Sequence, residues 1–370
     1  MDQQNIPLAQ ASIDKEDIEG VLGVLRSGRL ASGDKTPAFE RDFAAYVGSK
    51  YACAVSSGTA ALHLAIKALG IGPGDEVITS PFSFIASTNC ILYEGAIPVF
   101  ADIDEKTFNI DASKIERLIT PRTKAILPIH LFGQTADMDA ITAIAKKHSL
   151  AVIEDACESL GSSYNGKMAA TIGDIGVFGF YPNKQMTTGE GGMLVTDSES
   201  IYNLCGSLAN QGRGSDSVWL SYERMGYNYR LDEMSASLGL TQLAKVDRFI
   251  LERKEIAANY DRNLKSIPSL VLPSVASNRT HSWFAYVVRV TNGKRDAVRS
   301  ALRDAGIETR EYFPAIHLQP FMRERFGFKE GDFPVAESVA LETMALPMYI
   351  GLRDPDIKRI ASEIIGSINI

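Results

Sequence analysis

Short apolar runs alternate with longer segments of helical periodicity between about residues 51 and 196. The apolar runs expected to form strands are residues 51–56, 76–79, 98–103, 124–130, 151–156, 177–181 and 192–196. The helices expected between them are residues 59–69, 84–93 and 138–148. Parallel strands need such crossover helices, which cover the sheet from both sides. The sequence therefore predicts an α/β large domain of three αβα layers around a mainly parallel, mixed sheet.

The pattern changes after about Asn228. The elements expected there are a long charged helix at residues 232–264, a strand at 284–290 and helices at 295–305 and 354–367. They predict a smaller C-terminal α+β domain. We place the boundary beside the long helix, so that residues 1–245 form the large domain and residues 246–370 the small one. The N-terminal segment could pack on the small domain.

Composition argues against several classes of function. The 370 residues carry a net charge of −7, and no basic run would follow the phosphates of a nucleic acid or an anionic membrane. The N-terminus lacks the plan of a signal peptide, and no apolar stretch has the length of a bilayer span. The four cysteines and five histidines have no metal-ligand or disulfide spacing. We expect a cytoplasmic protein without a metal, nucleic-acid or membrane partner.

A turn at Ser57-Gly58-Thr59 follows an expected strand and opens an expected helix. The first N–H groups of a helix have no partner within the helix, and its dipole favours an anion there. A glycine allows close approach to the backbone, and Thr59 adds a hydroxyl group. This is a candidate phosphate site. An ordinary helix cap has the same residue types, so that interpretation stays open.

Two carboxylates, Glu154 and Asp155, stand where another expected strand ends. Ligands of open parallel sheets bind at the carboxyl ends of the strands. A carboxylate there could bind a metal, a ribose or a ring nitrogen. It could equally cap the turn that follows.

Lys184 follows the uncharged run Phe178–Tyr181 and precedes a loop rich in threonine and glycine that ends at Gly192. Most lysines are solvated surface residues. A lysine delivered by an apolar strand into such a loop is instead a candidate nucleophile, because an amine held there can attack a carbonyl group.

The three features together match one ligand. A helix start for a phosphate, a carboxylate for a ring nitrogen and a lysine for an aldehyde are what pyridoxal 5'-phosphate requires. Asp155 would keep the pyridine nitrogen protonated, and Lys184 would meet the aldehyde. Phe84, at the start of the next helix, could stack on the open face of the ring.

The chain resembles the DegT/DnrJ/EryC1/StrS sugar aminotransferases, which belong to the fold type I pyridoxal-phosphate-dependent transferases. The motifs that carry the resemblance span nearly the whole chain: Ser27-Gly28-Arg29, Ser57-Gly58-Thr59, Gly72 to Val77, Pro81 to Asn89, Glu154-Asp155-Ala156, Lys184, Gly189 to Gly192, Gly226 to Arg230, Tyr312-Phe313-Pro314 with His317, and Leu346 to Tyr349. In combination they are highly specific.

The resemblance implies roles for the candidate residues. Lys184 would form the Schiff base with the cofactor and act as general acid and base in the proton shift. Asp155 would pair with the pyridinium, Gly58 and Thr59 would hold the phosphate, and Phe84 would stack on the ring.

Further roles follow from the same resemblance. Glu158 would lie near the ring hydroxyl group, and His317 would approach the sugar nucleotide. Asn228 matches a residue that reaches the phosphate from the neighbouring subunit, which implies a homodimer with shared active sites.

Three residues depart from the family pattern. Gly179 stands where a serine is common, so one phosphate contact would be missing. Glu158 replaces a frequent glutamine and would alter the electrostatics of the ring. Gln211 stands in place of a histidine.

The resemblance implies amino transfer from glutamate to a nucleotide-linked keto sugar by ping-pong chemistry. The loop Gly189–Gly192 resembles the enzymes that act at C4 more than those that act at C3. One alternative is a related sugar dehydratase or lyase, but family dehydratases carry histidine in place of the lysine. The other is a regulatory protein that binds the cofactor without turnover, for which the chain shows neither an added DNA-binding segment nor a broken site.

Overall fold

A computed structural model describes residues 5–214, 221–291 and 293–368. Its main sheet has seven strands in the order β1-β9-β8-β5-β4-β2-β3. The strands are β1 (Tyr51–Val55), β2 (Glu76–Thr79), β3 (Ile97–Phe100), β4 (Thr123–Ile126), β5 (Ala151–Asp155), β8 (Ile175–Gly179) and β9 (Gly192–Thr196). Strand β9 runs antiparallel to both β8 and β1, and the pairs from β8 to β3 are parallel. The expected mainly parallel, mixed sheet is confirmed.

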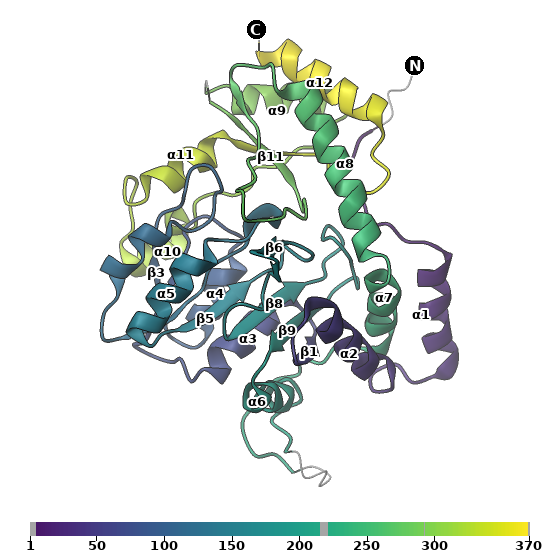
Figure 1. The fold of residues 1–370 in the computed structure, drawn as a ribbon, viewed down its shortest axis with the longest axis vertical. Helices are drawn as coiled ribbons and strands as arrows, with labels where there is room; N and C mark the ends of the chain where they lie inside the picture. Colours follow the sequence, from purple (N-terminus) through teal and green to yellow (C-terminus); the bar gives the residue numbers. More distant parts are fainter. Residues whose placement is uncertain (1–4, 215–220, 292, 369–370) are drawn as a thin grey trace.

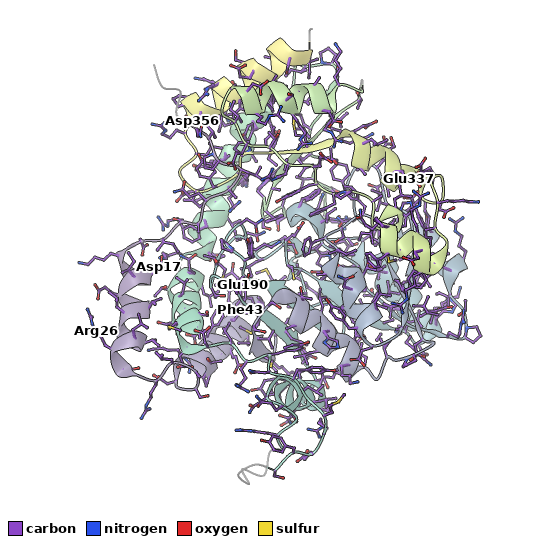
Figure 2. The ribbon with its side chains drawn as sticks, turned by 180° about the vertical axis from the view of Figure 1, so that it is seen from behind. Asp17, Arg26, Phe43, Glu190, Glu337 and Asp356 are labelled. Carbon is purple, nitrogen blue, oxygen red and sulfur yellow. The ribbon has the colours of Figure 1, made fainter. Side chains whose placement is uncertain are left out.

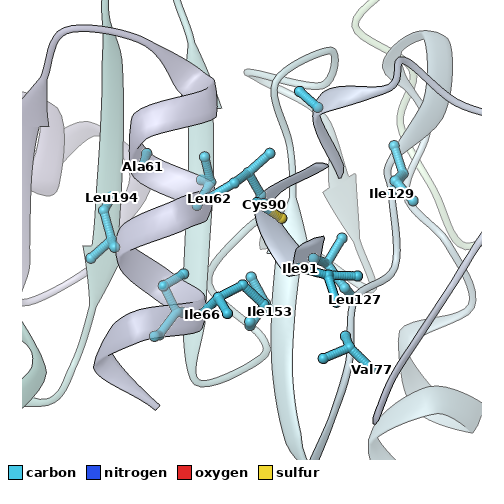
Figure 3. Packing of buried hydrophobic residues seen from close by; sticks show 14 of the residues in the cluster. Ala61, Leu62, Ile66, Val77, Cys90, Ile91, Leu127, Ile129, Ile153 and Leu194 are labelled. Atoms are coloured by element: carbon cyan, nitrogen blue, oxygen red, sulfur yellow. The ribbon is translucent and has the colours of Figure 1, made fainter. Parts of the chain in front are cut away.

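Successive side chains of these strands pack on opposite faces of the sheet, as the two-residue period of a strand requires. Ile153 packs with α3 (Gly58–Ala68), α4 (Ala86–Tyr93) and α6 (Glu199–Ala209) on one face. Figure 3 shows α3 and α4 on the strands of that face. Its neighbour Val152 packs with α5 (Met138–His148) on the other face, where α2 (Lys35–Val47) and α7 (Glu233–Leu243) also lie. The three-layer αβα prediction is therefore confirmed.

A second, smaller sheet of antiparallel strands lies in the C-terminal part of the chain. Its strands are β10 (Leu270–Val271), β11 (Tyr286–Val290) and β12 (Thr343–Leu346), and the helices around it are α8 (Val246–Leu264), α9 (Arg295–Asp304) and α12 (Asp354–Ile368). They share a separate apolar core that includes Ile6 from the N-terminal segment. Ile6 also forms a bridge with Ile307, so the start of the chain lies against this C-terminal part.

The expected helix 232–264 is two helices in the structure, α7 and α8, which are separated at Ala244 and Lys245. The break has a physical reason, because the two helices pack against different partners. Helix α7 packs on α1 (Lys15–Ser27) and α2, whereas α8 leads into the second core, as Figure 1 shows. Lys245 fixes the break through ion pairs with Asp14 and Asp17 beside α1. A domain boundary near residue 245 stays a prediction.

The remaining elements had no sequence prediction: the hairpin β6 (Ser163–Tyr164) and β7 (Lys167–Met168), helices α1, α2, α6, α10 (Pro320–Phe326) and α11 (Pro334–Glu342), strands β10 and β12, and short 3-10 turns at Ala112–Lys114, Glu116–Leu118, Leu131–Gly133 and Ile316–Leu318. The connection between α10 and α11 packs beside the edge strand β3, where the rings of Phe328 and Phe333 contact that of Phe100. Within the described residues, no helix has the length and apolar character needed to cross a bilayer.

Candidate active site

A cavity of about 790 Å³ opens where β5 and β8 end and α3 begins. Six of the predicted site residues line it: Gly58, Thr59, Phe84, Asp155, Glu158 and Lys184. Its inner wall, as we call it, consists of Gly58, Asp155, Glu158, Gly179 and Lys184. Its rim consists of Phe84, Tyr181, Glu190, Glu311 and Phe321, all of which are exposed. The fold thus gathers residues that are far apart in the sequence at one edge of the sheet.

The turn before α3 leaves room that a side chain would fill. Ser57 caps the helix, and its Oγ accepts a hydrogen bond from the N–H of Ala60 at 3.1 Å. A Cβ atom at Gly58 would lie 2.8 Å from Sγ of Cys157 and 3.3 Å from Cα of Gly179. The helix N-terminus is therefore open to an anion only because residue 58 is a glycine.

Gly179, one of the departures from the family pattern, packs directly against the same thiol. A Cβ atom at position 179 would lie 3.3 Å from Sγ of Cys157. The Cys157 side chain thus occupies space that the side chain of a serine at position 179 would need. Cys157 had no sequence signal as a pocket residue beyond its place after Asp155.

The carboxylates of Glu154 and Asp155 have different surroundings, because neighbours on a strand point to opposite faces. Glu154 is fully buried and accepts hydrogen bonds from His130 Nε2 at 2.7 Å and from three backbone N–H groups. Asp155 lines the cavity, where Ser87 Oγ donates to its Oδ2 at 2.7 Å and the N–H of Cys157 to its Oδ1 at 3.1 Å. Only Asp155 is placed to meet a ligand in the cavity.

Lys184 enters the cavity from the loop after β8, where its N–H donates to the carbonyl of Tyr181 at 2.9 Å. Its Nζ lies 3.6 Å from Oε1 of Glu158 and 4.1 Å from the ring centroid of Phe284. The N–H of Phe132 donates to Oε2 of Glu158 at 3.0 Å. Burial raises the pKa of the Glu158 carboxyl and outweighs the opposing effect of the Lys184 charge.

Aromatic side chains surround the opening of the cavity. Phe84 is 58% exposed, and its ring centroid lies 6.5 Å from that of Phe313. Tyr312 stacks on Phe313, and burial raises the pKa of Tyr312 to about 12. Tyr312 and Phe313 also line the cavity. Both belong to a family motif, but no role was predicted for either. Glu311 of the rim pairs with Arg299.

Asn228 and His317 do not line the cavity of their own chain. Asn228 is exposed and forms a backbone bridge with Asn210. Gln211, the third departure, lies beside it and accepts a hydrogen bond from Arg230 at 2.7 Å. The predicted contact of Asn228 with a neighbouring subunit stays a prediction.

His317 is fully buried below the rim. Its Nε2 and Oε1 of Glu337 are 2.9 Å apart, and its ring centroid lies 4.7 Å from that of Phe333. Glu337 belongs to α11, and Figure 2 shows it well away from Glu190 of the rim. These contacts explain the burial of His317 by packing, and its predicted contact with a sugar nucleotide stays a prediction.

The inner wall fits pyridoxal phosphate on the chemistry of its groups. It offers an unobstructed helix start for a dianionic phosphate, a buried carboxylate for a ring nitrogen and one amine for an aldehyde. No group of three or more His, Cys, Asp or Glu side chains in the described part of the chain could hold a metal ion.

The layered fold and the inner wall define the class of fold type I pyridoxal-phosphate-dependent transferases. The profile of the DegT/DnrJ/EryC1/StrS aminotransferase family matches residues 11–365. The chain belongs to this family and is an enzyme of the aminotransferase class.

Relatives and solved structures agree with that assignment. The chain is 43% identical over 366 residues to spore coat polysaccharide biosynthesis protein SpsC of Bacillus subtilis (strain 168), covering 95% of this chain and 94% of the relative. It is 39% identical over 368 residues to GDP-perosamine synthase of Caulobacter vibrioides, covering 98% of each. Among solved structures, DesV from S. venezuelae superposes with a TM-score of 0.93 at 34% identity over 99% of each chain.

Proposed function

We propose that this protein is a pyridoxal-phosphate-dependent aminotransferase that moves an amino group from glutamate to a nucleotide-linked keto sugar. We propose C4 rather than C3 of the sugar as the acceptor, from the resemblance of the loop Gly189–Gly192. The single observation that carries the proposal is the meeting of Lys184, Asp155 and Gly58 in one cavity. A relative named GDP-perosamine synthase supports a nucleotide sugar as the substrate, and we infer that the reaction takes place in the cytoplasm.

In this proposal, Gly58, Thr59 and Asp155 would hold different parts of the cofactor. The N-terminus of α3 would hold the phosphate through backbone N–H groups near Gly58, and Thr59 would add its hydroxyl group. Asp155 would accept a hydrogen bond from the ring nitrogen and keep a proton on it. Ser87 and the N–H of Cys157 orient that carboxylate, because each donates to one of its oxygens.

The cofactor, when bound, supplies an electron sink that stabilises negative charge at the substrate carbon. Lys184 serves as general acid and base, and its Nζ moves a proton to and from that carbon. Glu158 faces the same Nζ at 3.6 Å and keeps the amine directed into the cavity. Buried side chains around Lys184 exclude water from this part of the reaction.

The rim leaves room for a large second substrate. Four of the lining residues are acidic, namely Asp155, Glu158, Glu190 and Glu311, and among the described lining residues Lys184 is the one cation. Two of the four, Glu190 and Glu311, lie in the rim, and the described lining residues offer no cation there for the phosphate groups of a nucleotide sugar. We therefore propose that a second copy of the chain supplies further polar and cationic groups, including Asn228, in a homodimer with shared active sites.

The decisive experiment is a two-step conversion. Purified protein with pyridoxal phosphate and glutamate should release 2-oxoglutarate. Addition of a nucleotide 4-keto sugar should then yield the corresponding amino sugar. Both products are measured by mass spectrometry. Lys184→Ala should abolish both steps. A parent protein that releases no 2-oxoglutarate, or a Lys184→Ala variant as active as the parent, would refute the proposal.

The same experiment separates the alternatives. Loss of water from the sugar without amine transfer would identify a dehydratase. Binding of the cofactor without turnover of any nucleotide keto sugar tested would favour a regulatory protein. A comparison of nucleotide 3-keto sugars with 4-keto sugars as acceptors decides between C3 and C4.

A further inference from the structure

Arg253 of α8 is 3% exposed, and no carboxylate among the described residues forms an ion pair with it. Burial alone lowers its pKa, to about 10, so the guanidinium stays charged at neutral pH. Across the described residues, its hydrogen bonds all go to backbone carbonyl groups. A buried arginine without a carboxylate is rare and costly, because its desolvation is repaid only in part. The position of Arg253 therefore requires an explanation.

The carbonyl groups that accept from Arg253 belong to three separate segments of the chain. Nη1 donates to Trp283 at 3.1 Å, to Phe284 at 3.2 Å and to Met348 at 3.4 Å. Nη2 donates to the carbonyl of Lys184 at 3.4 Å. One side chain thus connects the loop of the catalytic lysine with the segments that flank β11 and β12.

Two of these contacts determine what lies around the amine of Lys184. The ring of Phe284 lies under Nζ, with 4.1 Å between Nζ and the ring centroid. Trp283, just before it, has a φ of 54°, a strained left-handed conformation for a large side chain. The bonds from Arg253 to the Trp283 and Phe284 carbonyls hold this strained turn, and with it the ring.

We propose that Arg253 is a positioning residue that fixes the depth and direction of the Lys184 amine, by holding the Lys184 carbonyl and the Phe284 ring beneath the amine. The proposal rests on the proposed role of Lys184 as the cofactor lysine. The planar guanidinium suits this task because its fork of five N–H donors reaches several carbonyls at once, whereas a lysine offers donors from a single nitrogen.

A purely structural function for Arg253 predicts something different. If the side chain served only to join the segments, its loss would lower the stability, but the folded molecules would present Lys184 unchanged. A positioning function predicts slower reaction of Lys184 in molecules that are fully folded. A rate measured at the Lys184 amine therefore separates the two functions.

The experiment labels Lys184 with pyridoxal phosphate. Apo-protein is mixed with the cofactor, trapped with borohydride at set times, and the Lys184 peptide is quantified by mass spectrometry. Arg253→Met should label about 10- to 100-fold more slowly, the size of effect known for small misplacements of reacting groups. Arg253→Lys should recover part of the rate. The circular dichroism signal of the bound cofactor should be weakest in Arg253→Met, intermediate in Arg253→Lys and strongest in the parent.

Two further variants make the test independent of folding defects. Phe284→Leu keeps every carbonyl that Arg253 bonds but removes the ring under Nζ, so it should also slow labelling while it stays folded. Arg289→Met removes another buried arginine, on β11, which pairs with Glu342 and Glu105 rather than with the cavity. It should lower the melting temperature and leave the labelling rate unchanged.

The outcomes are distinct. Labelling of folded Arg253→Lys and Phe284→Leu at the parental rate would overturn the positioning proposal, even if Arg253→Met fails to fold. Absence of labelling at Lys184 in the parent protein would instead overturn the proposed function on which it rests.

Discussion

The inner wall and the rim of the cavity are built in different ways. Asp155 and Glu158 of the inner wall are each 5% exposed, and backbone N–H groups or a serine hydroxyl hold their carboxylates. Phe84, Tyr181 and Phe321 of the rim are between 41% and 58% exposed. The wall stands at strand ends of the main sheet, whereas the rim consists of loops and helix ends from both parts of the chain.

This difference suggests that the inner wall serves the reaction itself and that the rim serves binding. Side chains fixed by a rigid sheet hold a reacting group within the tolerance that catalysis demands, whereas exposed loop residues can change without disturbing the core. We expect changes in the wall to affect the chemistry or the hold on the cofactor phosphate, and changes in the rim to affect the affinity for the cofactor ring or the second substrate with little effect on kcat.

The largest effect is expected for Asp155→Asn. The substitution keeps the shape of the side chain but removes the charge that would hold a proton on the cofactor ring. We expect kcat/KM to fall about 10²- to 10³-fold, the usual loss when one electrostatic partner of a reaction is removed. The melting temperature should stay close to that of the parent, because the amide oxygen can still accept from the N–H of Cys157 and the Ser87 hydroxyl group can turn to accept from the amide NH2.

Glu154→Gln is the matched control on the same strand. Glu154 accepts four hydrogen bonds in the core, so the variant should lose stability, about 3 kcal/mol or more. The folded fraction should keep the parental kcat/KM. The reverse result, a stable but inactive Glu154→Gln, would show that the division between wall and core is wrong.

The next effect concerns the helix start. In Gly58→Ala the new methyl group would lie 2.8 Å from Sγ of Cys157 and would crowd the proposed phosphate site. We expect about a tenfold loss of cofactor affinity, which corresponds to about 1.4 kcal/mol, measured by titration of the apo-protein. The double variant Gly58→Ala with Cys157→Ala should recover part of it. Gly23→Ala, in α1 with open space around it, should leave the affinity unchanged.

Much of the fold could be predicted from the sequence. The apolar runs gave the strands of the main sheet to within a few residues, because a sheet buried on both faces needs such runs. The break between α7 and α8 could not be predicted, since Lys245 has no helix-breaking tendency of its own and pairs with Asp14 and Asp17, far away in the sequence. Helices α1, α2, α10 and α11 were not predicted, because they lie outside the stretch between residues 51 and 196 in which strands and helices alternate.

The residues of the candidate site could be predicted only in part from the sequence. Periodicity alone could not decide which of Glu154 and Asp155 faces a ligand, because this depends on which helices cover each face of the sheet. Phe284 and Arg253 surround Lys184 from 100 and 69 positions along the chain, and no local pattern marks them. Six residues with a role implied by the family resemblance line the cavity, whereas Arg253 and Phe284, which only packing places near Lys184, had no prediction.

A third prediction tests the electrostatics of the inner wall. Burial raises the pKa of Glu158 above its ordinary value of 4.5, so the folded state favours the protonated form. The carboxyl therefore stabilises the fold most below its ordinary pKa, and this contribution is lost as the pH rises through the raised value. Glu158→Gln does not titrate. The free energy of unfolding of the parent minus that of Glu158→Gln should therefore fall with rising pH.

Denaturant titrations of the apo-proteins between pH 4 and 9 measure this difference, with about 1.4 kcal/mol expected for each unit by which the pKa is raised. A difference that is flat over the whole range would mean that Glu158 titrates normally. The Lys184 charge would then compensate its burial in full.

The smallest effect is expected at the rim, for Phe84→Leu. Since the ring is 58% exposed, its loss should change the free energy of unfolding by no more than about 0.5 kcal/mol. Loss of stacking on the cofactor ring should cost about 1 kcal/mol, or about a fivefold rise in its dissociation constant, with kcat nearly unchanged. Fluorescence titration and steady-state kinetics measure both. A loss in kcat as large as that of Asp155→Asn would mean that Phe84 takes part in positioning the reacting groups. The distinction between wall and rim would then be wrong.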